Sequence, residues 1–314
     1  MNILVVGGAG YIGGYLTDYL CSGHNVLVYD NLLYENMFLK NIQFKFGDVR
    51  DHDTLSETID SFKPDAIVWL SAIVGDGACQ VDPVLTNEVN YKSVEWLCDN
   101  YDGKIIFTST CSVYGVNNDL IDEGATPNPL SIYASTKLKA EQYLLDNHDN
   151  CLVFRLGTLY GLSDTYSRIR LDLVSNILTM RAVRGEALSI FGGEQWRPLL
   201  HVKDVSTAIK HGLENEITGL FNLHENNYTI KDLAEKIVET VSSESIIKYV
   251  DMPFEDLRNY RTTSDKYRAT GWYPSFSMDD GIMEMARAIK EGRIPDVNIP
   301  LFSNEKYLKE IDLG

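Results

Sequence analysis

The chain has 314 residues, and its apolar fraction of 44% and charged fraction of 23% are ordinary for a soluble globular protein. Its formal net charge of −17 argues against a nucleic-acid polymer as a partner, because such binding needs clustered lysine and arginine. The five cysteines are scattered without a C-x-x-C pair, and no Cys/His spacing suits a metal, so we expect reduced thiols and no metal site. Because no leader pattern and no apolar run near ~20 residues occurs, we expect a cytoplasmic protein that does not associate with membranes.

Apolar runs rich in β-branched residues alternate with amphipathic stretches through the first half of the chain. Strands are expected at 3–6, 25–29, 42–46, 66–70, 104–108 and 151–154. Helices are expected at 11–22, 51–60, 83–99 and 131–147. Apolar strands that alternate with helices are typical of a parallel sheet covered on both faces. The pattern predicts an α/β fold with a Rossmann-type doubly wound parallel sheet, in which ligands bind at the carboxyl ends of the strands.

The regularity weakens in the second half of the chain. Helices are expected at 168–184, 204–215 and 229–241, and loops at 192–198 and 252–275. The tail from residue 296 onward has no interpretable pattern. We therefore divide the chain into a Rossmann domain at 1–160 and a smaller C-terminal α/β lobe at 161–314, which we expect to bind the substrate. The segment near 204–215 is expected to return to the first domain.

A glycine-rich turn joins the first predicted strand to the first predicted helix. Gly7, Gly10 and Gly13 follow a G-x-x-G-x-x-G spacing, and Tyr11 and Ile12 open the helix between them. Glycines permit the tight turn and let a pyrophosphate approach the backbone, while the helix amino terminus offers N–H groups to it. The turn therefore predicts a dinucleotide site.

Acidic residues follow the second and third predicted strands. Asp30 lies about 20 residues beyond the glycines, where a carboxylate accepts hydrogen bonds from the adenosine ribose and repels a 2′-phosphate. It favours NAD over NADP, although Asp30-Asn31 could also be a simple turn. Asp48 could contact the adenine amine or cap the helix at 51–60, and the sequence leaves both interpretations open.

Tyr133 and Lys137 lie four residues apart in a predicted helix, which places their side chains on one face. A free tyrosine has a pKa near ~10, and a cation within about 4–6 Å lowers it. The pair can therefore form a base that takes a proton from a hydroxyl while a hydride leaves the same carbon. The alternative is a plain amphipathic helix face. Thr110, in a hydroxyl cluster after a predicted strand, is either part of the same site or an ordinary strand-end hydroxyl.

Together these elements resemble the extended short-chain dehydrogenase/reductase family, in its nucleotide-sugar epimerase and dehydratase branch. The resemblance covers most of the chain. Its motifs are Gly7-x-x-Gly10-x-x-Gly13, Asp30, Gly47-Asp48-Val49, Asn90, 109–115, Tyr133-x-x-x-Lys137, 155–161, Asn176, Arg197, 201–205 and Trp272-Tyr273-Pro274.

The resemblance implies a role for each matching position. Tyr133 would be the general base, Lys137 would hydrogen-bond the nicotinamide ribose and lower the pKa of Tyr133, and Thr110 would hydrogen-bond the reacting oxygen. For Arg197 the alternative is a surface ion pair. The positions expected to contact NAD are Gly7, Gly10, Tyr11, Ile12, Gly13, Asp30, Asn31, Asp48, Val49, Ser71, Ala72, Asn90 and Lys137. The positions expected to contact a nucleotide-diphosphate sugar are Ser112, Asn176, Arg197 and Arg258.

The two residues after Thr110 narrow the reaction. Dehydratases of the branch usually carry Asp-Glu there, and enzymes that epimerise C3 or C5 often have a cysteine at the second position, whereas this chain has Cys111-Ser112. We therefore expect an NAD-dependent nucleotide-sugar epimerase that oxidises the hexose C4 hydroxyl and re-reduces the 4-keto intermediate. The alternatives are a 4-dehydrogenase or 4,6-dehydratase in glycan precursor synthesis and, from another class, a non-catalytic NAD-sensing regulator.

Segments 71–76 and 196–198 depart from the usual pattern of the family and flank the expected substrate cleft. They indicate an uncommon sugar.

The resemblance also implies an assembly. In the family, helices at 83–99 and 131–147 pair across a two-fold axis, and their surplus of apolar residues here suits a homodimer or higher homo-oligomer. The alternative is that these residues only face the sheet.

Overall fold

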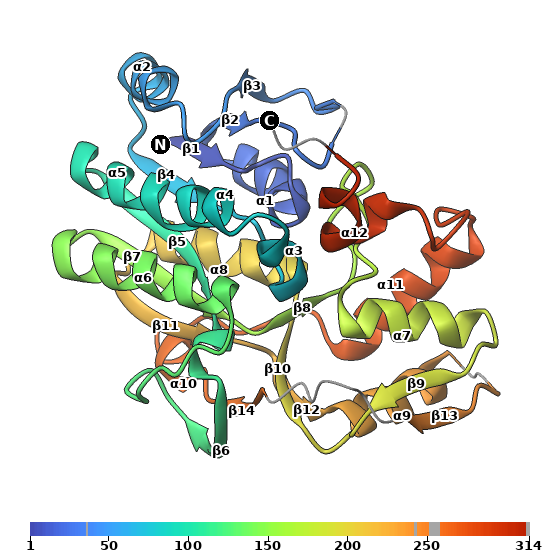
Figure 1. Ribbon diagram of the computed structural model, residues 1–314. Helices are drawn as coiled ribbons and strands as arrows, with labels where there is room; N and C mark the ends of the chain where they lie inside the picture. Colours follow the sequence, from blue (N-terminus) through green and yellow to red (C-terminus); the bar gives the residue numbers. More distant parts are fainter. Residues whose placement is uncertain (36, 242–243, 251–257, 312–314) are drawn as a thin grey trace.

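The structure, a computed structural model, describes residues 1–35, 37–241, 244–250 and 258–311. Its centre is a sheet of seven parallel strands in the order β11-β7-β5-β4-β1-β2-β3 (Figure 1). The strands are β1 Asn2–Val6, β2 Asn25–Asp30, β3 Gln43–Phe46, β4 Ala66–Trp69, β5 Lys104–Thr110, β7 Cys151–Leu156 and β11 Gly219–Leu223. All six strands predicted in the first half of the chain belong to this sheet, and the Rossmann-type α/β fold is confirmed.

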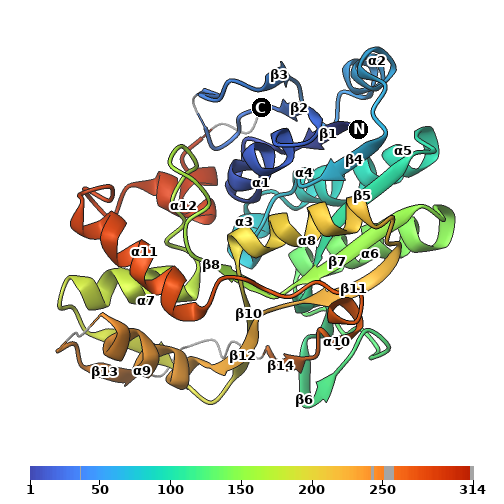
Figure 2. The same ribbon diagram turned by 180° about the vertical axis from the view of Figure 1, so that it is seen from behind.

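Helices cover both faces of the sheet, because its central strands are apolar on both sides. Helices α1 and α8 pack on one face, and α2, α5 and α6 bury their apolar residues on the other (Figures 1 and 2). The helices around the sheet are α1 Tyr11–Cys21, α2 His52–Phe62, α3 Asp76–Val81, α4 Pro83–Asn87, α5 Ser93–Asn100, α6 Ile132–Asn147 and α8 Val202–Glu214.

The helix predicted at 83–99 is divided into three parts. Between α4 and α5 lies one π-helical turn, η1, over Glu88–Lys92. Single π-helical turns inside helices often mark functional positions. Here the turn carries Asn90, whose side chain points into the protein and holds the chain after β4.

The second lobe is built from small sheets and helices; its small sheets lie below the central sheet in Figures 1 and 2, and α11 and α12 lie to one side. One sheet has the order β12-β10-β8, and two pairs are β13-β9 and β14-β6. Its strands are β6 Val116–Ile121, β8 Thr158–Tyr160, β9 Leu188–Phe191, β10 Trp196–His201, β12 Asn226–Thr229, β13 Ile247–Val250 and β14 Asn259–Thr262. The remaining elements are η2 Cys111–Tyr114, α7 Val174–Val183, α9 Ile230–Thr240, α10 Asp265–Arg268, α11 Met278–Lys290, η3 Pro300–Phe302 and α12 Asn304–Leu308.

Three predictions in the second half were wrong in part. The helix predicted at 168–184 begins only at Val174, because residues before it are irregular and bonded to the tail. The loop predicted at 192–198 ends at Trp196, where β10 begins; Pro198 lies inside that strand. The loop predicted at 252–275 contains β14 and α10, while residues 251–257 lie outside the described part.

The chain returns to the central sheet after entering the second lobe. Helix α8 packs on α1, and β11 then pairs in parallel with β7 at the sheet edge. The segment predicted near 204–215 corresponds to α8. The division into domains at 1–160 and 161–314 stays a prediction.

The structure describes the tail that the sequence left unplaced up to residue 311. Its short elements η3 and α12 pack against α3 and the segment before α7 (Figure 2). In the ranges that the structure describes, no helix is both long and apolar enough to cross a membrane.

Candidate active site

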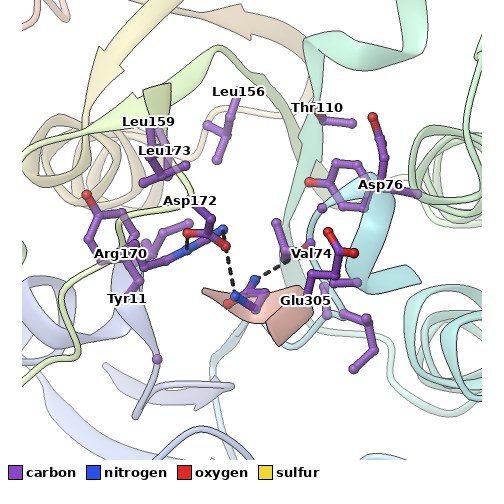
Figure 3. A pocket seen from close by; sticks show the side chains of 18 of the residues that line it. Tyr11, Val74, Asp76, Thr110, Leu156, Leu159, Arg170, Asp172, Leu173 and Glu305 are labelled. Carbon is purple, nitrogen blue, oxygen red and sulfur yellow. Dashed lines mark hydrogen bonds and ion pairs between the residues drawn. The ribbon is translucent and has the colours of Figure 1, made fainter. Parts of the chain in front are cut away.

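A cavity of about 740 Å³ lies along the carboxyl ends of β1, β2, β4 and β5 and extends to the second lobe (Figure 3). Sixteen of the predicted site residues line it. They are Gly7, Gly10, Tyr11, Ile12, Asp30, Asn31, Asp48, Val49, Ser71, Ala72, Thr110, Ser112, Tyr133, Lys137, Arg197 and Arg258. Gly13, Asn90 and Asn176 do not line it.

The glycine turn has the shape that its spacing predicts. Gly7 has φ +81°, and a side chain there would bring its Cβ to 2.5 Å from the backbone nitrogen of Ser71. Gly13 packs against the backbone of Gly8, so its role is the close packing of α1 rather than ligand contact. Helix α1 begins after Gly10 without a side-chain cap or an acidic first turn. The backbone N–H groups of its first turn can therefore bind phosphate oxygens.

Asp30 lies beside the glycine turn at the end of β2. Its Oδ2 accepts a hydrogen bond from the backbone N–H of Ala9 at 3.0 Å, and its Oδ1 accepts one from Leu32 at 2.8 Å. Burial raises the pKa of Asp30 from its ordinary value, and the two backbone donors oppose this effect. The bond from Leu32 is the contact expected if Asp30-Asn31 were a simple turn. However, the Asp30 carboxylate also lines the cavity next to the glycines. This is the arrangement that suits the ribose hydroxyls of NAD.

Asp48 is held by two neighbours at the same end of the cavity. Its carboxylate accepts hydrogen bonds from Arg50 Nε and Asn31 Nδ2, each at 3.0 Å. Burial would raise the pKa of Asp48, but these donors hold it below its ordinary value. The cap of α2 is instead Asp51, which accepts from the backbone N–H of Thr54. The capping alternative for Asp48 is therefore wrong.

Thr110, Tyr133 and Lys137 all line the cavity. Thr110 ends β5, whereas Tyr133 and Lys137 lie on α6, which begins after its cap Ser131. Lys137 is only 2% exposed, and its Nζ lies 3.9 Å from the centre of the Phe107 ring. Burial lowers the pKa of Lys137 to about 7.

Burial has the opposite effect on the phenol of Tyr133. It raises the pKa of Tyr133, the Cys79 thiol adds to this, and the hydroxyl of Thr110 opposes it. The expected lowering of this pKa by Lys137 therefore stays a prediction for the complex with NAD, whose nicotinamide ring also carries positive charge.

A buried network behind the site fixes the face of α6. Ser109 Oγ donates to Glu141 Oε2 at 2.6 Å, and Arg155 Nε donates to Glu141 Oε1 at 3.0 Å. Arg155 Nη1 also donates to Tyr114 Oη at 2.8 Å. Glu141 lies one helical turn beyond Lys137 and is fully buried. The network ties α6 to β5 and β7, and the sequence analysis missed it because ion pairs between distant residues leave no local pattern.

Two of the expected contact residues support the cavity wall from behind. Asn90 accepts from the backbone N–H of Ile73 at 2.8 Å and donates to its carbonyl oxygen at 2.9 Å. Asn176 accepts from Gly161 N–H and donates to the carbonyl oxygen of Arg170, both at 2.9 Å. The structure thus places both amides as supports of lining segments, away from the positions expected for ligand contact.

An ion pair between Arg170 and Asp172, which the sequence analysis did not single out, lines the cavity opposite Thr110. Arg170 donates from Nε and Nη2 to the two carboxylate oxygens of Asp172, each at 2.9 Å. Figure 3 shows this pair on the same side as Tyr11, at the start of α1. The sequence Arg168-Ile169-Arg170 could have indicated this site, but it was interpreted as the start of the helix predicted at 168–184.

The far end of the cavity belongs to the second lobe. Ser112 Oγ and Tyr260 Oη lie 3.3 Å apart, and the guanidinium carbon of Arg197 lies 5.7 Å from the centre of the Tyr260 ring. Arg197 is 6% exposed, which excludes the alternative of a surface residue. Arg258 forms an ion pair with Asp76 at 3.0 Å.

Residues 303–305 of the tail form part of the cavity lining. Asn304 N–H donates to Asp172 Oδ2 at 2.9 Å, and Asn304 Nδ2 donates to the carbonyl oxygen of Val74 at 2.8 Å. Its Oδ1 also accepts from Arg168, whose Nη1 reaches the carbonyl oxygen of Leu301 at 2.7 Å. We call residues 300–308 the C-terminal strap. It joins the chain after β4 to the arginine segment, and Figure 3 shows the bonds in the cavity.

Comparison with known proteins identifies the family of the chain. Residues 3–223 match the model of the NAD dependent epimerase/dehydratase family. The chain is 28% identical to a UDP-glucose 4-epimerase of Rhizobium meliloti over 308 residues, which cover 88% of this chain and 93% of the relative. It is also 28% identical to UDP-glucuronic acid decarboxylase 6 of Arabidopsis thaliana over 305 residues, with 90% and 87% covered.

A solved structure gives the same result. UDP-glucose 4-epimerase of Thermotoga maritima, crystallised with UDP-glucose, superposes with a TM-score of 0.81 at 26% identity, covering 93% of this chain and 100% of that one. The matches confirm the resemblance to the extended short-chain dehydrogenase/reductases, and the glycine turn and Asp30 fit NAD as the cofactor. The chain belongs to the NAD-dependent epimerase/dehydratase family.

Proposed function

We propose that the protein is an NAD-dependent UDP-hexose 4-epimerase. One observation carries the proposal: Thr110, Tyr133 and Lys137 line the same cavity as the glycine turn and Asp30. The three relatives compared above are named for UDP-sugars, and two of them are UDP-glucose 4-epimerases, which supports the choice of nucleotide and of reaction.

The residues around the phenol carry the proton transfers. Tyr133 takes the proton of the sugar C4 hydroxyl and returns it to O4 after the sugar has turned over in the cavity. The Thr110 hydroxyl bonds to the same oxygen and aligns the transfer. Lys137 places positive charge near the forming phenolate and stabilises it. Bound NAD supplies the acceptor of the C4 hydride and the donor that returns it to the opposite face of the 4-keto sugar.

The structure around Cys111 supports epimerisation over loss of water. Elimination across C5 and C6 needs an acid and a base beside the sugar. Cys111 follows Thr110, is fully buried and donates to the carbonyl oxygen of Arg155 at 3.2 Å. Burial raises the pKa of its thiol to about 12, so it is a poor acid or base near neutral pH. The 4,6-dehydratase alternative lacks its usual carboxyl groups at this position.

The C-terminal strap supports an epimerase over a 4-dehydrogenase. A dehydrogenase must exchange or reoxidise its cofactor after each turnover, whereas an epimerase recycles it in place. Asn304 bonds the strap to both sides of the cavity, and the ring of Tyr307 packs on Tyr34, 5.5 Å away between centres. Tyr34 follows Asp30 and Asn31 in the same lining. A strap at this place hinders cofactor exchange and suits recycling.

The variant Tyr133→Phe tests the proposed base. Purified protein would be loaded with NAD, mixed with UDP-glucose, and followed in a single turnover by formation of the C4 epimer. We expect the rate to fall by about three orders of magnitude or more, because proton transfer is lost while NAD stays bound. The control is Tyr143→Phe, on the same helix, where the phenol bonds to Asp99. A near-normal rate in Tyr133→Phe would remove Tyr133 from this role.

The same experiment tests the regulator alternative. A non-catalytic NAD sensor would leave UDP-glucose, and every other sugar nucleotide offered, unchanged with bound NAD fully oxidised. Turnover by the wild type rules this alternative out.

We also propose a homodimer formed through α4–α5 and α6. Most apolar residues of these helices are buried in the core, but Val84 and Leu145 are exposed. They belong to α4 and α6, two helices that contact each other (Figure 1). Sedimentation of the full chain should give twice 35.4 kDa, and Val84→Lys with Leu145→Lys should give the monomer. A wild-type monomer at micromolar concentration would refute the assembly.

A further inference from the structure

We propose that Arg50 binds the adenine of NAD through the flat face of its guanidinium, and that Asp48 positions Arg50 instead of contacting the base. Neither role depends on the sugar, so both go beyond the proposed function. Three observations carry the proposal. They are the place of the two residues in the cavity, the hydrogen bonds of the Asp48 carboxylate, and the way these bonds orient the Arg50 guanidinium.

The ends of β2 and β3 place Arg50 where the adenine is expected. Asp30, which suits the adenosine ribose, is in register with Phe46 at the end of β3, and its carbonyl oxygen accepts from Gly47 N–H at 3.1 Å. Asp48 and Arg50 follow directly in the chain, and both line the same cavity as Asp30. Because the base is attached to this ribose, adenine at this end of the cavity lies against the segment after β3.

The carboxylate of Asp48 is already saturated with hydrogen bonds. Its Oδ1 accepts from the backbone N–H of Arg50 at 2.9 Å and from Arg50 Nε at 3.0 Å. Its Oδ2 accepts from Arg50 Nη2 and from Asn31 Nδ2, both at 3.0 Å. A carboxylate offers about four lone-pair positions, and these four donors occupy them. An adenine amine would have to displace one of these bonds, so the contact with the amine that the sequence left open for Asp48 is disfavoured.

The same hydrogen bonds fix the plane of the Arg50 guanidinium. Nε and Nη2 form a fork with the two oxygens of Asp48, which holds the two planar groups edge to edge. Nη1 lies 3.7 Å from Glu88 Oε2 in the π-helical turn η1. Because N–H bonds lie in the guanidinium plane, these partners occupy its edge and not its faces. The side chain of Arg50 is 36% exposed even though it is paired, so a ligand can reach it.

A guanidinium face suits a purine ring. Arginine stacks on flat aromatic systems, including the bases of nucleotides, and its charge is attracted to their electron-rich faces. This contact needs no free N–H group, so the ion pair with Asp48 supports it by fixing the plane. Val49 and Val89 follow Asp48 and Glu88 in the chain and also line the cavity, where they add apolar surface for a ring.

Two dinucleotides separate a contact through the face of the base from one through its amine. They are NAD and nicotinamide purine dinucleotide, in which hydrogen replaces the adenine amine. Calorimetric titration of cofactor-free protein should give affinities within about threefold of each other, because the amine makes no bond to Asp48. Arg50→Ala should weaken both dinucleotides by about fivefold, since both lose the stacking contact. Arg50→Lys keeps the charge but not the plane, and should weaken both nearly as much.

The matched control is Arg287→Ala. It removes an exposed arginine that is likewise paired with a carboxylate, that of Glu291, but lies on α11. Both affinities should stay unchanged in this variant. The midpoint of thermal unfolding, measured for every variant, shows that each is folded.

The positioning role of Asp48 is tested by a double-mutant cycle on NAD affinity. Asp48→Asn puts an N–H group against the donors of Arg50 and breaks the fork, so we expect NAD to bind about fivefold more weakly. Adding Arg50→Ala should cause no further loss, because Asp48 acts through Arg50. A side chain that only stabilised the fold would instead give a separate loss that adds to that of Arg50→Ala.

Three results would overturn the proposal. The first is a loss of about tenfold or more with the purine dinucleotide in the wild type that disappears in Asp48→Asn, which would place the adenine amine on Asp48. The second is near-normal NAD affinity in Arg50→Ala or Arg50→Lys. The third is additive losses in the double variant. None of these results touches Tyr133 or the sugar, so the proposed function stands or fails separately.

Discussion

The side chain of Asn304 donates a hydrogen bond to the carbonyl oxygen of Val74 at 2.8 Å, joining residues that are 230 positions apart in the chain. The same residue bonds through its backbone to Asp172 and through its Oδ1 to Arg168. One buried asparagine thus connects the two walls of the cavity with the tail. From this position we infer that the tail helps to hold the cofactor.

The variant Asn304→Ala should release NAD faster than the wild type. It removes both hydrogen bonds of the Asn304 side chain, and each is worth about 0.5–1.5 kcal/mol, so we expect dissociation faster by about tenfold. The measurement is release of NAD after rapid dilution, followed by separation of free and bound cofactor. Asn298→Ala is the control, because Asn298 lies in the same tail and its side chain donates to nearby Asp296. Equal release rates for the two variants would mean that the strap does not retain the cofactor.

The buried pair of Glu141 and Arg155 predicts a large effect on stability. The two side chains are 1% and 4% exposed, and removing one partner leaves an uncompensated buried charge. We expect Glu141→Ala to lower the free energy of unfolding by about 3–5 kcal/mol. Glu57→Ala, an exposed glutamate on α2, should change it little. Chemical denaturation of both variants measures the difference, and similar values would show that the network does not stabilise α6.

Lys137 makes stability depend on pH in a defined direction. Burial lowers its pKa from 10.5 to about 7, so between these values the unfolded chain binds more protons than the folded one. The free energy of unfolding of the wild type, taken relative to Lys137→Met, should therefore rise with pH across that window. The limiting slope is about 1.4 kcal/mol per pH unit. A flat difference would show that Lys137 keeps its ordinary pKa in the folded protein, and a difference that falls as pH rises would show a raised pKa.

Asp30 should set the choice between the two nicotinamide dinucleotides. In Asp30→Asn the repulsion of a 2′-phosphate is lost, and the preference for NAD over NADP should shrink by about tenfold or more. Titration of cofactor-free protein with NAD and with NADP measures this preference. Asp53→Asn, an exposed residue in the first turn of α2, serves as the control. An unaltered preference would place the ribose hydroxyls elsewhere.

The central sheet was predictable because its strands are continuous apolar runs. Ile3, Leu4, Val5 and Val6 are all fully buried in β1, and this burial on both faces is what removes the alternation from the sequence. The glycine turn and the spacing of Tyr133 and Lys137 were predictable for a similar reason. Each is a local pattern whose geometry follows from a single turn or helix.

The parts that the sequence did not show depend on contacts between distant segments. Asn176 has the residue type of a ligand contact, but its neighbours in space turn it toward the backbone of Gly161 and Arg170. The elements of the strap are too short to show a periodic pattern. Pro198 led us to predict a loop, but it lies in β10, which pairs with β12 and β8. The residues next to these positions in the sequence do not indicate which distant segment each of them contacts.

The most direct test of the account is the fate of UDP-glucose with the purified protein and no added cofactor, followed by proton NMR. We predict that the C4 epimer, UDP-galactose, forms to an equilibrium that is also reached from UDP-galactose, while bound NAD remains oxidised at the end. Accumulation of a free keto sugar with reduced cofactor, or release of water or carbon dioxide, would contradict the proposed 4-epimerase.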